Sequence, residues 1–412
     1  MTEKKHILFI HQFATTYDEP GEIRHIEMFK SLKDKGIRVT VISGSVNYQT
    51  GVHYPDFKGF SQEKELAGIS RSFIAFYRIY CAPTYRKGFI GRILNYISFL
   101  ITSFIFSLSI KNVDIVLATS PSLFTGLAGW FISLFRSRPF FFEMRDLWPK
   151  VAVEMGLLKN KSLIDIAYWL EKFLCLKAVR NIVITEGYAG YIESIGINRN
   201  KIAIVENGVD SWMVEHKITH DDCPGIIEKI KDKFLVMYVG AIGKFNYLDE
   251  MLKADLKISR RDDIHFVFVG DGGERKALEE YASNEKLSNV HFTGSVSKEI
   301  IPSYLQWAGV CFSIYPFIPT GSLLLQNKVL DYMSMAKPVL LIAPEGDTSR
   351  IIEKADCGFC IQTDTELIAK KIIWFLENPD KRVRMGENGR DYVRRNLLRE
   401  DLAVKFAEAL NI

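Results

Sequence analysis

The sequence predicts an α/β protein with two doubly wound domains in tandem. Its 412 residues are enough for two domains of ordinary size. Apolar runs typical of buried parallel strands alternate with helical segments, as in sheets that helices cover on both faces. The alternation stops in a polar stretch at residues 211–233 and then starts again. We therefore expect one domain at residues 1–210, a second at residues 211–390, and a helical tail at residues 391–412, whose packing back on the first domain is left open.

Each expected domain has its own series of strands. The first series is KKHILFIHQF, RVTVISGSV, VDIVLATS, RPFFFEMRD, NIVITEG and KIAIVENGVD, with a loop containing Gly21 and a helix at residues 22–35 after the first strand. The second series is FLVMYVG, HFVFVGDG, NVHFTG, GVCFSIYP, PVLLIAP and GFCIQ. Open parallel sheets bind ligands at the carboxyl ends of their strands. Two such sheets therefore predict a central cleft that carries the function.

Charge and cysteine content restrict the class of protein. With 53 Lys and Arg against 49 Asp and Glu, the net charge of +4 is too small to indicate a nucleic-acid partner. Most of the six cysteines lie in apolar runs, and no secretory signal precedes the first strand. We therefore expect a reducing, cytoplasmic compartment, with Cys357 and Cys360 in structural roles.

An uncharged segment raises the question of a membrane. Residues 93–110 carry no charge, which is close to the shortest length that spans a bilayer. Asn95, Ser98 and Thr102 recur at helical spacing, so we expect a helix of the domain core rather than a span. The preceding segment mixes aromatic residues with cations, a composition that suits lipid headgroups. A solvated loop beside a half-buried strand is the alternative. The cations of the predicted acceptor and membrane face are Arg78, Arg86, Lys87 and Arg92.

Two glycine-rich turns follow strands of the second series. Gly243 and Lys244 lie between the strand FLVMYVG and a helix, where backbone N–H groups and a cation suit a phosphate. A purely steric turn is an equal alternative, and no P-loop sequence is present. Gly270 and Gly272 form a G-x-G without the third glycine of a dinucleotide site, so a nicotinamide enzyme is poorly supported.

The segment NKVLDYMSMAKPV carries the most specific pattern. We expect a helix at residues 323–336, capped by Ser322, with Asn327, Lys328 and Asp331 on its polar side. Lys328 and the helix N-terminus suit a diphosphate, and a carboxylate one turn later can accept two hydrogen bonds from a ribose diol. The alternative is a solvent-facing helix with an ordinary i,i+3 ion pair.

These segments, together with FEMRDLWPK, NGVD and MGENGRDYV, resemble the retaining family 4 glycosyltransferases of GT-B fold. The likeness runs in order along nearly the whole chain. It is nearest to the O-antigen and capsule branch that contains N-acetyl-L-fucosamine transferases. The resemblance implies two Rossmann-like domains facing a cleft and an enzyme that uses a nucleotide sugar as substrate, without a cofactor or a metal.

The resemblance also implies roles for residues that match family positions. It places Lys244 and Lys328 on the donor phosphates, Asp331 on the ribose, and Arg145 and Asp146 beside the donor sugar. The remaining donor-site positions are Gly21, Gly243, Val296 and Asn327. Leu323 departs from the family, because it replaces the first of two glutamates eight residues apart and so puts the identity of the sugar in doubt.

The resulting expectation is a retaining transferase. It moves a sugar from a nucleoside diphosphate, UDP in first place, to an undecaprenyl-diphosphate-linked saccharide at the inner face of the cell membrane. A departing diphosphate carries its own charge, so cations and helix N-termini can stabilise it without a protein nucleophile. A sugar-nucleotide 2-epimerase of the same fold and a non-catalytic nucleotide- or lipid-binding subunit remain as alternatives. His216, His220, Asp221, Asp222 and Cys223 are not expected to hold a metal.

Overall fold

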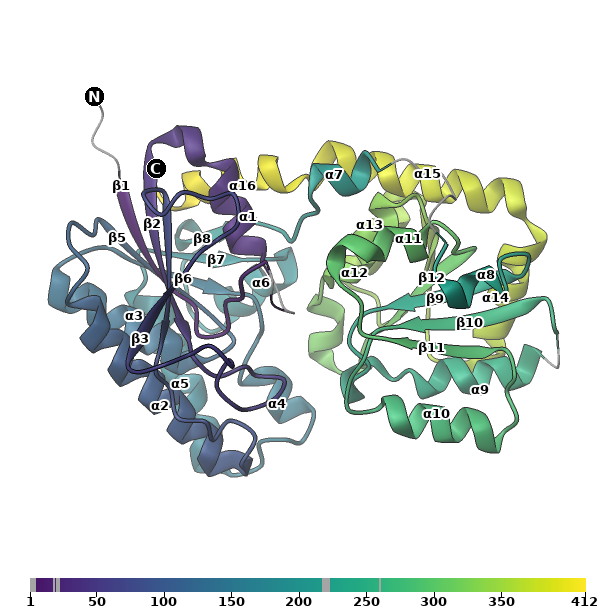
Figure 1. The fold of residues 1–412 in the computed structure, drawn as a ribbon, viewed down its shortest axis with the longest axis horizontal. Helices are drawn as coiled ribbons and strands as arrows, with labels where there is room; N and C mark the ends of the chain where they lie inside the picture. Colours follow the sequence, from purple (N-terminus) through teal and green to yellow (C-terminus); the bar gives the residue numbers. More distant parts are fainter. Residues whose placement is uncertain (1–4, 18, 20–22, 217–222, 259–260) are drawn as a thin grey trace. The chain divides into compact units, whose positions relative to one another are not determined.

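The computed structural model describes residues 5–17, 19, 23–216, 223–258 and 261–412. The chain forms two compact units (Figure 1). Unit 1 is Met1–Glu206 with Glu400–Ile412, and unit 2 is Asn207–Arg399. Both are α/β units built on parallel strands, which confirms the predicted fold class. The tail was expected to start at residue 391, but that residue lies inside a helix of unit 2, and the chain passes to unit 1 only at Glu400.

Unit 1 is built on an eight-stranded sheet in the order β3-β4-β2-β1-β5-β6-β7-β8. Neighbouring strands are parallel except for β3 and β4. The strands are β1 Lys5–Ile10, β2 Ile37–Gly44, β3 Ser61–Lys64, β4 Ile74–Ile79, β5 Ile115–Thr119, β6 Phe140–Met144, β7 Arg180–Val183 and β8 Ile202–Ile204. The helices are α1 Arg24–Ser31, α2 Gly88–Ser107, α3 Leu123–Arg136, α4 Lys150–Glu154, α5 Lys161–Lys177, α6 Glu186–Ser194 and α16 Arg399–Ala409.

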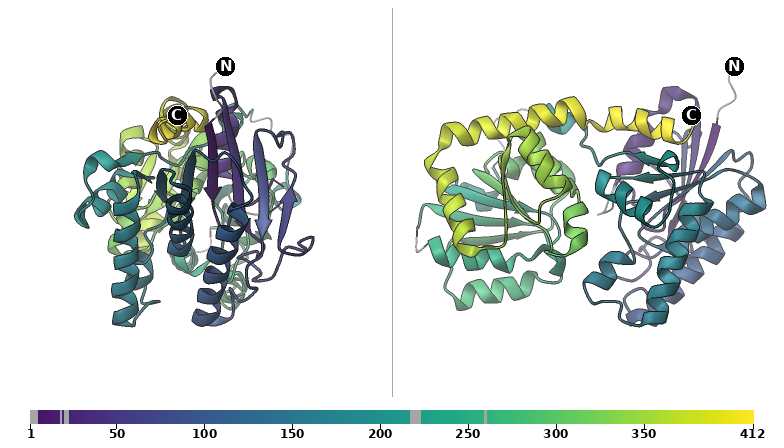
Figure 2. Two further views of the ribbon diagram at one scale, coloured as in Figure 1. Left: turned by 90° about the vertical axis from the view of Figure 1, so that its left-hand side faces the viewer. Right: turned by 180° about the vertical axis from the view of Figure 1, so that it is seen from behind.

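Helices cover both faces of this sheet (Figures 1 and 2). On one face, the apolar residues of α1 and α16 form a buried cluster with alternate residues of the central strands, such as Ile7 and Phe9 of β1. The C-terminal helix therefore completes the core of unit 1. On the other face α3 lies between α2 and α5.

The apolar helix α2 differs from the expected core helix. It buries small and polar residues, among them Asn95, Thr102 and Ser103, and only 28% of its most apolar window is inside the protein. By length and composition alone, α2 is the one helix in the described chain that could cross a membrane. The expected burial in the core was wrong, because the side of α2 that faces the domain consists of small and polar residues with Phe99, and most of its apolar residues lie outside.

Unit 2 is built on a six-stranded parallel sheet in the order β11-β10-β9-β12-β13-β14. The strands are β9 Phe234–Val239, β10 Ile264–Val269, β11 Val290–Gly294, β12 Val310–Ile314, β13 Val339–Ile342 and β14 Gly358–Ile361. The helices are α7 Ser211–Val214, α8 Gly225–Glu228, α9 Asp249–Ile258, α10 Arg275–Asn284, α11 Ile301–Leu305, α12 Asn327–Ser334, α13 Asp347–Ala355, α14 Thr365–Glu377 and α15 Pro379–Asn396. All six strands predicted for the second half are present.

The strand residues of unit 2 alternate between two cores. Leu235, Met237 and Val239 of β9 face a cluster that contains α12, and Val236 and Tyr238 face a cluster that contains α9 and α14. The order of the strands reverses between β9 and β12, which are neighbours in the sheet but far apart in the sequence. In open parallel sheets this switch point is where ligands bind, beyond the carboxyl ends of the strands.

Candidate functional site

Lys328 lies at the switch point of unit 2. It is the second residue of α12, and its side chain reaches back to the end of β9. Its Nζ donates to the hydroxyl of Tyr238 at 2.7 Å and to Oδ1 of Asn246 at 2.8 Å. A Cβ placed on Gly240 would come within 3.2 Å of the Lys328 side chain, so this glycine allows the lysine to lie against the backbone. The lysine therefore joins the start of α12 to the end of β9 and the turn that follows it, about 80 to 90 residues earlier in the sequence.

The partners of Lys328 are neutral and oriented. The Tyr238 hydroxyl donates to the carbonyl oxygen of Ala241 at 2.7 Å, and the amide of Asn246 donates to the same oxygen at 2.9 Å. Both groups therefore present only acceptors to the lysine. The Nζ also lies 4.5 Å from the centre of the Tyr238 ring, within range of a cation–π contact.

Burial lowers the pKa of Lys328 from 10.5 to about 7. Among the described residues no carboxylate forms an ion pair with it. An ammonium group has three donors, and two are used here. The third donor and the uncompensated charge suit an anionic oxygen, and the first N–H groups of α12 point to the same end of the helix.

The helix around Lys328 begins later than the sequence suggested. Residues Pro319–Leu323 form a short 3-10 turn, and α12 starts only at Asn327. Ser322 does not cap the helix, because its hydroxyl donates to the carbonyl of Pro319. Leu323 consequently lies outside the helix, whereas Asn327 and Lys328 are its first two residues. This correction places the lysine nearer to the positive end of the helix dipole.

The two glycine turns pack against each other. A Cβ on Gly270 would lie 1.9 Å from the carbonyl oxygen of Gly240, and one on Gly272 would lie 2.3 Å from that of Ile242. The backbone N–H of Ile242 donates to the carbonyl of Asp271 at 2.8 Å. The G-x-G after β10 therefore holds the turn after β9 and has a steric role.

Lys244 is not at the start of a helix. It opens a short 3-10 turn, Lys244–Asn246, and α9 begins at Asp249. Its side chain is exposed, and in the described chain no hydrogen bond or ion pair restrains its amine. Gly243 precedes it, and Asn246 two residues later binds Lys328. Lys244 therefore shares a short turn with a residue that binds Lys328.

Asp331 lies one turn after Lys328 and is half-buried. Burial raises the pKa of its carboxyl to about 6, although the charges of Lys298 and Arg399 lower it. Asp210 pairs with both of those cations, with Nζ of Lys298 at 2.6 Å and with Nη1 of Arg399 at 2.5 Å. In the described part of the chain the Asp331 carboxylate has no hydrogen-bond partner. The Lys328–Asp331 ion pair of the alternative interpretation does not form in the described chain, which favours the interpretation in which each side chain binds a ligand.

Two further donor-site predictions have less support. Val296 follows the edge strand β11 and is half-buried against the core that contains α12, and no contact joins it to Lys328 in the described chain. Gly21 lies outside the described residues. Asn327 is half-buried at the first position of α12.

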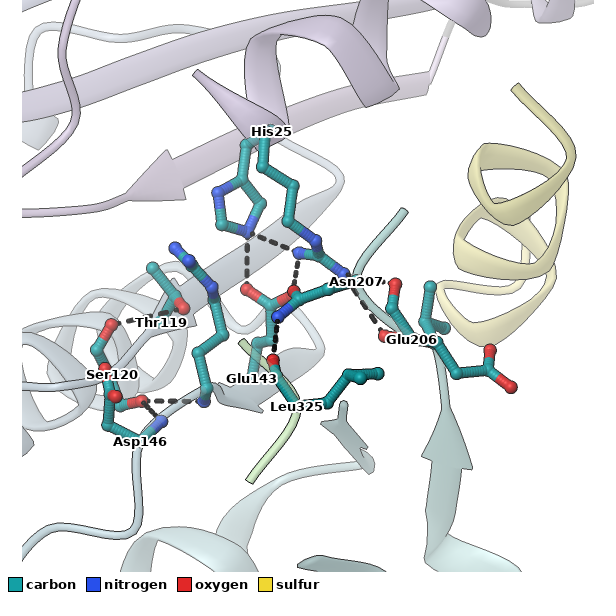
Figure 3. A network of polar contacts seen from close by, with 11 residues as sticks. His25, Thr119, Ser120, Glu143, Asp146, Glu206, Asn207 and Leu325 are labelled. Atoms are coloured by element: carbon teal, nitrogen blue, oxygen red, sulfur yellow. Dashed lines mark hydrogen bonds and ion pairs between the residues drawn. The ribbon is translucent and has the colours of Figure 1, made fainter. Parts of the chain in front are cut away.

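Unit 1 has a buried charge cluster at the carboxyl end of its sheet (Figure 3). Glu143 of β6 pairs with Nη1 of Arg24 at 2.6 Å and with Nε2 of His25 at 2.5 Å. Burial would raise the pKa of the Glu143 carboxyl, but His25 and Arg24 hold it below its usual range. The ring of His11 lies edge-on to His25, and burial holds the pKa of His11 well below its usual range. Arg24 also donates to the carbonyl of Val205, so the cluster ties α1 to β6 and to the segment after β8.

Arg145 and Asp146 follow β6 directly. The backbone N–H groups of both residues donate to the Ser120 hydroxyl, at 2.8 Å and 3.1 Å. Ser120 directly follows the neighbouring strand β5, so one hydroxyl fixes the turn on which both side chains lie. Arg145 is half-buried and Asp146 is exposed. The structure places them at the same sheet edge as the cluster around Glu143 (Figure 3).

One residue of the predicted acceptor face is misplaced. Arg78 is 1% exposed, pairs with Glu19 and donates to the carbonyl of Gly44 at 2.9 Å. Arg78 lies inside the strand β4, most of whose residues are buried. The sequence had offered a half-buried strand in this segment only as an alternative to a membrane-facing one. Arg86, Lys87 and Arg92 are exposed.

Other groups in the site were not expected from the sequence. Tyr238 and Asn246 were missed because a strand tyrosine and a loop asparagine carry no motif. Glu143, His25 and His11 were missed although FEMRD was noted. Within the described chain no three His, Cys, Asp or Glu residues gather as a metal site, and part of the segment around His216 lies outside it.

Comparisons with known proteins agree with this architecture. Residues 22–212 match the family model described as Glycosyltransferase Family 4, and residues 224–392 match the one described as Glycosyl transferases group 1. The chain is 25% identical over 240 residues to the uncharacterized glycosyltransferase MJ1069 of Methanocaldococcus jannaschii, a match over 58% of this chain and 59% of that protein. The chain thus spans about three fifths of the length of this curated relative.

Solved structures share the fold over nearly the whole chain. Sucrose-phosphate synthase from Thermosynechococcus elongatus superposes with a TM-score of 0.74 at 16% identity, covering 98% of both chains. HepE from Anabaena, solved with UDP-glucose, superposes with a TM-score of 0.71 at 14% identity, covering 98% of this chain and 99% of that one. At these identities the likeness concerns the fold.

Proposed function

This chain belongs with the family 4-like glycosyltransferases of the GT-B fold, and from that premise we propose that it transfers a sugar from a nucleoside diphosphate sugar. The observation that carries the proposal is the ammonium group of Lys328. It lies at a helix N-terminus and at the switch point of a parallel sheet, and its partners there are neutral. A diphosphate supplies the charge that this position lacks.

The nucleotide part of the donor fits the groups around Lys328. The lysine and the first N–H groups of α12 bind the diphosphate, and the exposed amine of Lys244 adds a second cation. The carboxylate of Asp331, one turn further along α12, accepts hydrogen bonds from the two ribose hydroxyls. UDP is the first candidate, because HepE was solved with UDP-glucose. The resemblance to the O-antigen branch favours an N-acetylated amino sugar such as FucNAc.

The chemistry we propose is transfer with retention of the anomeric configuration. The bond between the anomeric carbon and the diphosphate oxygen breaks, and the acceptor oxygen bonds to the same face of the sugar. The leaving diphosphate takes up the acceptor proton, and Lys328 and Lys244 stabilise its charge. These cations supply the charge neutralisation for which other transferases use a metal, so the scheme requires none. We assign Arg145 and Asp146 to positions beside the reacting sugar.

The acceptor we propose is an undecaprenyl-diphosphate-linked saccharide, in the assembly of O-antigen or capsule. The enzyme would act at the inner face of the cell membrane. The resemblance supports this assignment, and so do the exposed cations Arg86, Lys87 and Arg92 of unit 1.

Mass spectrometry of the products tests the proposal. The full chain is incubated with UDP-sugars, with and without a lipid-linked acceptor and with and without a chelator. We expect the mass of the acceptor to increase by one sugar, with or without the chelator. NMR of the product from an α-linked donor should show an α-linkage. Conversion of the donor alone would indicate the 2-epimerase. Nucleotide binding without any turnover would indicate a non-catalytic subunit.

A further inference from the structure

The outer side of the helices α2, α3 and α5 in unit 1 is apolar, unlike the outer side of an ordinary surface helix. Its most exposed members include Leu94, Ile101 and Ile105 of α2, Leu134 and Phe135 of α3, and Trp169 of α5, which we call the apolar helix face. Leu134, Phe135 and Trp169 are 62%, 67% and 64% exposed. Monomeric soluble proteins rarely leave so many large apolar side chains together in water.

Aromatic contacts make this face continuous across the three helices. Phe104 of α2 meets Phe135 of α3 edge-on at 5.6 Å. Trp130 of α3 meets Phe173 of α5 at 4.8 Å, and Phe173 stacks on Trp169 at 5.4 Å. The three helices lie side by side on one face of the sheet (Figure 2). The apolar helix face is therefore one surface rather than scattered residues.

The polar side of α2 is used inside the domain. Asn95 accepts from Gln12 at 2.8 Å and donates to the carbonyl of Ala82 at 2.7 Å. The hydroxyl of Thr102 donates to the carbonyl of Tyr80 at 2.6 Å. These bonds hold α2 on unit 1 and would be lost if the helix crossed a membrane. The helix is thus fixed with its apolar side outward.

The charges around this face are mostly positive. Neither α2 nor α3 contains an acidic residue, and α5 contains only Asp165 and the buried Glu171. Exposed cations border the face, among them Arg86, Lys87, Arg92, Lys111, Lys172 and Lys177. Of the acids nearest to these helices in sequence, Asp114 pairs with Arg138 at 3.9 Å, Glu154 pairs with Lys150 at 2.7 Å, and Glu143 is buried. An apolar surface with a cationic border is complementary to an anionic lipid bilayer.

We propose that the apolar helix face docks unit 1 on a bilayer that contains anionic lipids. The side chains of Ile101, Ile105, Phe135 and Trp169 enter the boundary between headgroups and acyl chains, and the bordering lysines and arginines contact phosphates. The helices lie on the membrane and do not span it. This docking deepens the acceptor part of the proposed function, yet it requires no transfer.

Sedimentation with lipid vesicles tests the docking. The full chain is mixed with vesicles of phosphatidylcholine, or of phosphatidylcholine with phosphatidylglycerol. We expect binding to the mixed vesicles that is weaker at high salt, because salt screens the cations, and weaker still to phosphatidylcholine alone. Absence of binding to the mixed vesicles would overturn the proposal.

A matched pair of variants locates the surface. Leu134→Ser with Phe135→Ser removes two apolar side chains from the face, and we expect the vesicle partition coefficient to fall by about tenfold or more. The control is Val52→Ser with Val383→Ser, which are 57% and 60% exposed outside the face. Equal binding by the two double variants would contradict the assignment of the surface.

Two further readings separate the alternatives. Brominated lipids should quench the tryptophan fluorescence of the wild type, and Trp169→Phe should lose part of this quenching while still binding. A wild type that is dimeric, and that the face variant makes monomeric, would show the face to be an interface between copies and overturn the proposal. UDP binding measured on the same samples distinguishes the two ideas. Vesicle binding without UDP binding would support the docking and contradict the proposed function. UDP binding without vesicle binding would contradict the docking alone.

Discussion

Lys328 keeps its ammonium group among neutral partners in unit 2. Burial brings its pKa to about 7, so close to neutral pH the group is held near its point of half protonation. A bound diphosphate stabilises the charged form and raises this pKa. Nucleotide binding should therefore be linked to the uptake of a proton by Lys328.

This linkage predicts the pH dependence of UDP affinity. Above about pH 7 the free lysine is neutral, so binding must add a proton, and affinity should fall by at most about tenfold per pH unit until the pKa of the complex is reached. In Lys328→Arg the side chain stays charged, so the fall should disappear. Calorimetry at several pH values, in two buffers of different ionisation enthalpy, measures the proton uptake. An equal fall in both proteins would contradict the assignment.

Asp331 predicts a dependence on the ribose hydroxyls. Its carboxylate is half-buried without a hydrogen-bond partner in the described chain, and hydrogen bonds to a charged group contribute about 1.5 to 3 kcal/mol each. Asp331→Ala loses two such bonds, about 3 kcal/mol or more, and should therefore bind UDP at least about a hundredfold more weakly. The variant should also no longer prefer UDP over 2′-deoxy-UDP, whereas the wild type should. An unchanged preference would place the ribose elsewhere.

At the residue scale, the sequence singled out some of the residues that form the candidate site. Lys328 and Asp331 could be selected because each is a charged residue on a helix whose other side is apolar. Tyr238 and Asn246 could not, because their role depends on α12 returning to the end of β9, which is a long-range contact. The i,i+3 ion pair of the alternative interpretation is absent because Lys328 turns toward β9.

Among the elements, the two glycine turns of unit 2 determine where the end of β9 lies. Gly270→Ala would place a Cβ 1.9 Å from the carbonyl oxygen of Gly240, and Gly240 borders Lys328. We expect the free energy of unfolding to fall by about 1 to 3 kcal/mol and UDP affinity to fall with it. Gly273→Ala is the control, since a Cβ there would have no neighbour within 4 Å. Denaturant unfolding and calorimetry on both variants check this, and equal stability would contradict the packing argument.

Sequence patterns predicted whether a segment is a helix or a strand. They predicted less well where an element begins and which side of a helix is buried. Every strand expected in the second half formed, because continuous apolar runs between turns are typical of buried parallel strands. The start of α12 was placed four residues too early, since the 3-10 turn before it has a similar composition. The orientation of α2 could not be predicted, because its polar residues bond to backbone groups that only the folded domain brings together.

For the whole molecule, the division into two units predicts that a substitution that destabilises unit 1 does not change ligand binding by unit 2. Glu143→Ala would leave Arg24 and His25 buried without their carboxylate, which should lower the free energy of unfolding by about 3 to 5 kcal/mol. UDP affinity should not change, because Lys328, Lys244 and Asp331, the side chains that we assign to the nucleotide, are all in unit 2. Glu193→Ala breaks an exposed pair with Arg199 and should cost less than about 1 kcal/mol. Chemical unfolding with calorimetry tests both points, and a parallel loss of UDP affinity would contradict the independence of the units.

The two-domain architecture followed from the sequence because the strand and helix alternation restarts after residue 233. The residue at which the chain passes from unit 2 back to unit 1 could not be predicted. It is Glu400, which follows the long helix α15 of unit 2. The central cleft stays a prediction.

Calorimetric titration of UDP, GDP, ADP and TDP into the wild type and Lys328→Met tests the central claim most directly. We predict that the wild type binds one of the four, UDP first, and that the variant binds it at least about tenfold more weakly. The unfolding temperature of the variant is measured beside that of the wild type, because Met removes a buried charge but also the hydrogen bonds to Tyr238 and Asn246. Equal affinity of the two proteins, or no binding of any diphosphate by the folded wild type, would contradict the assignment of Lys328 to a donor phosphate site.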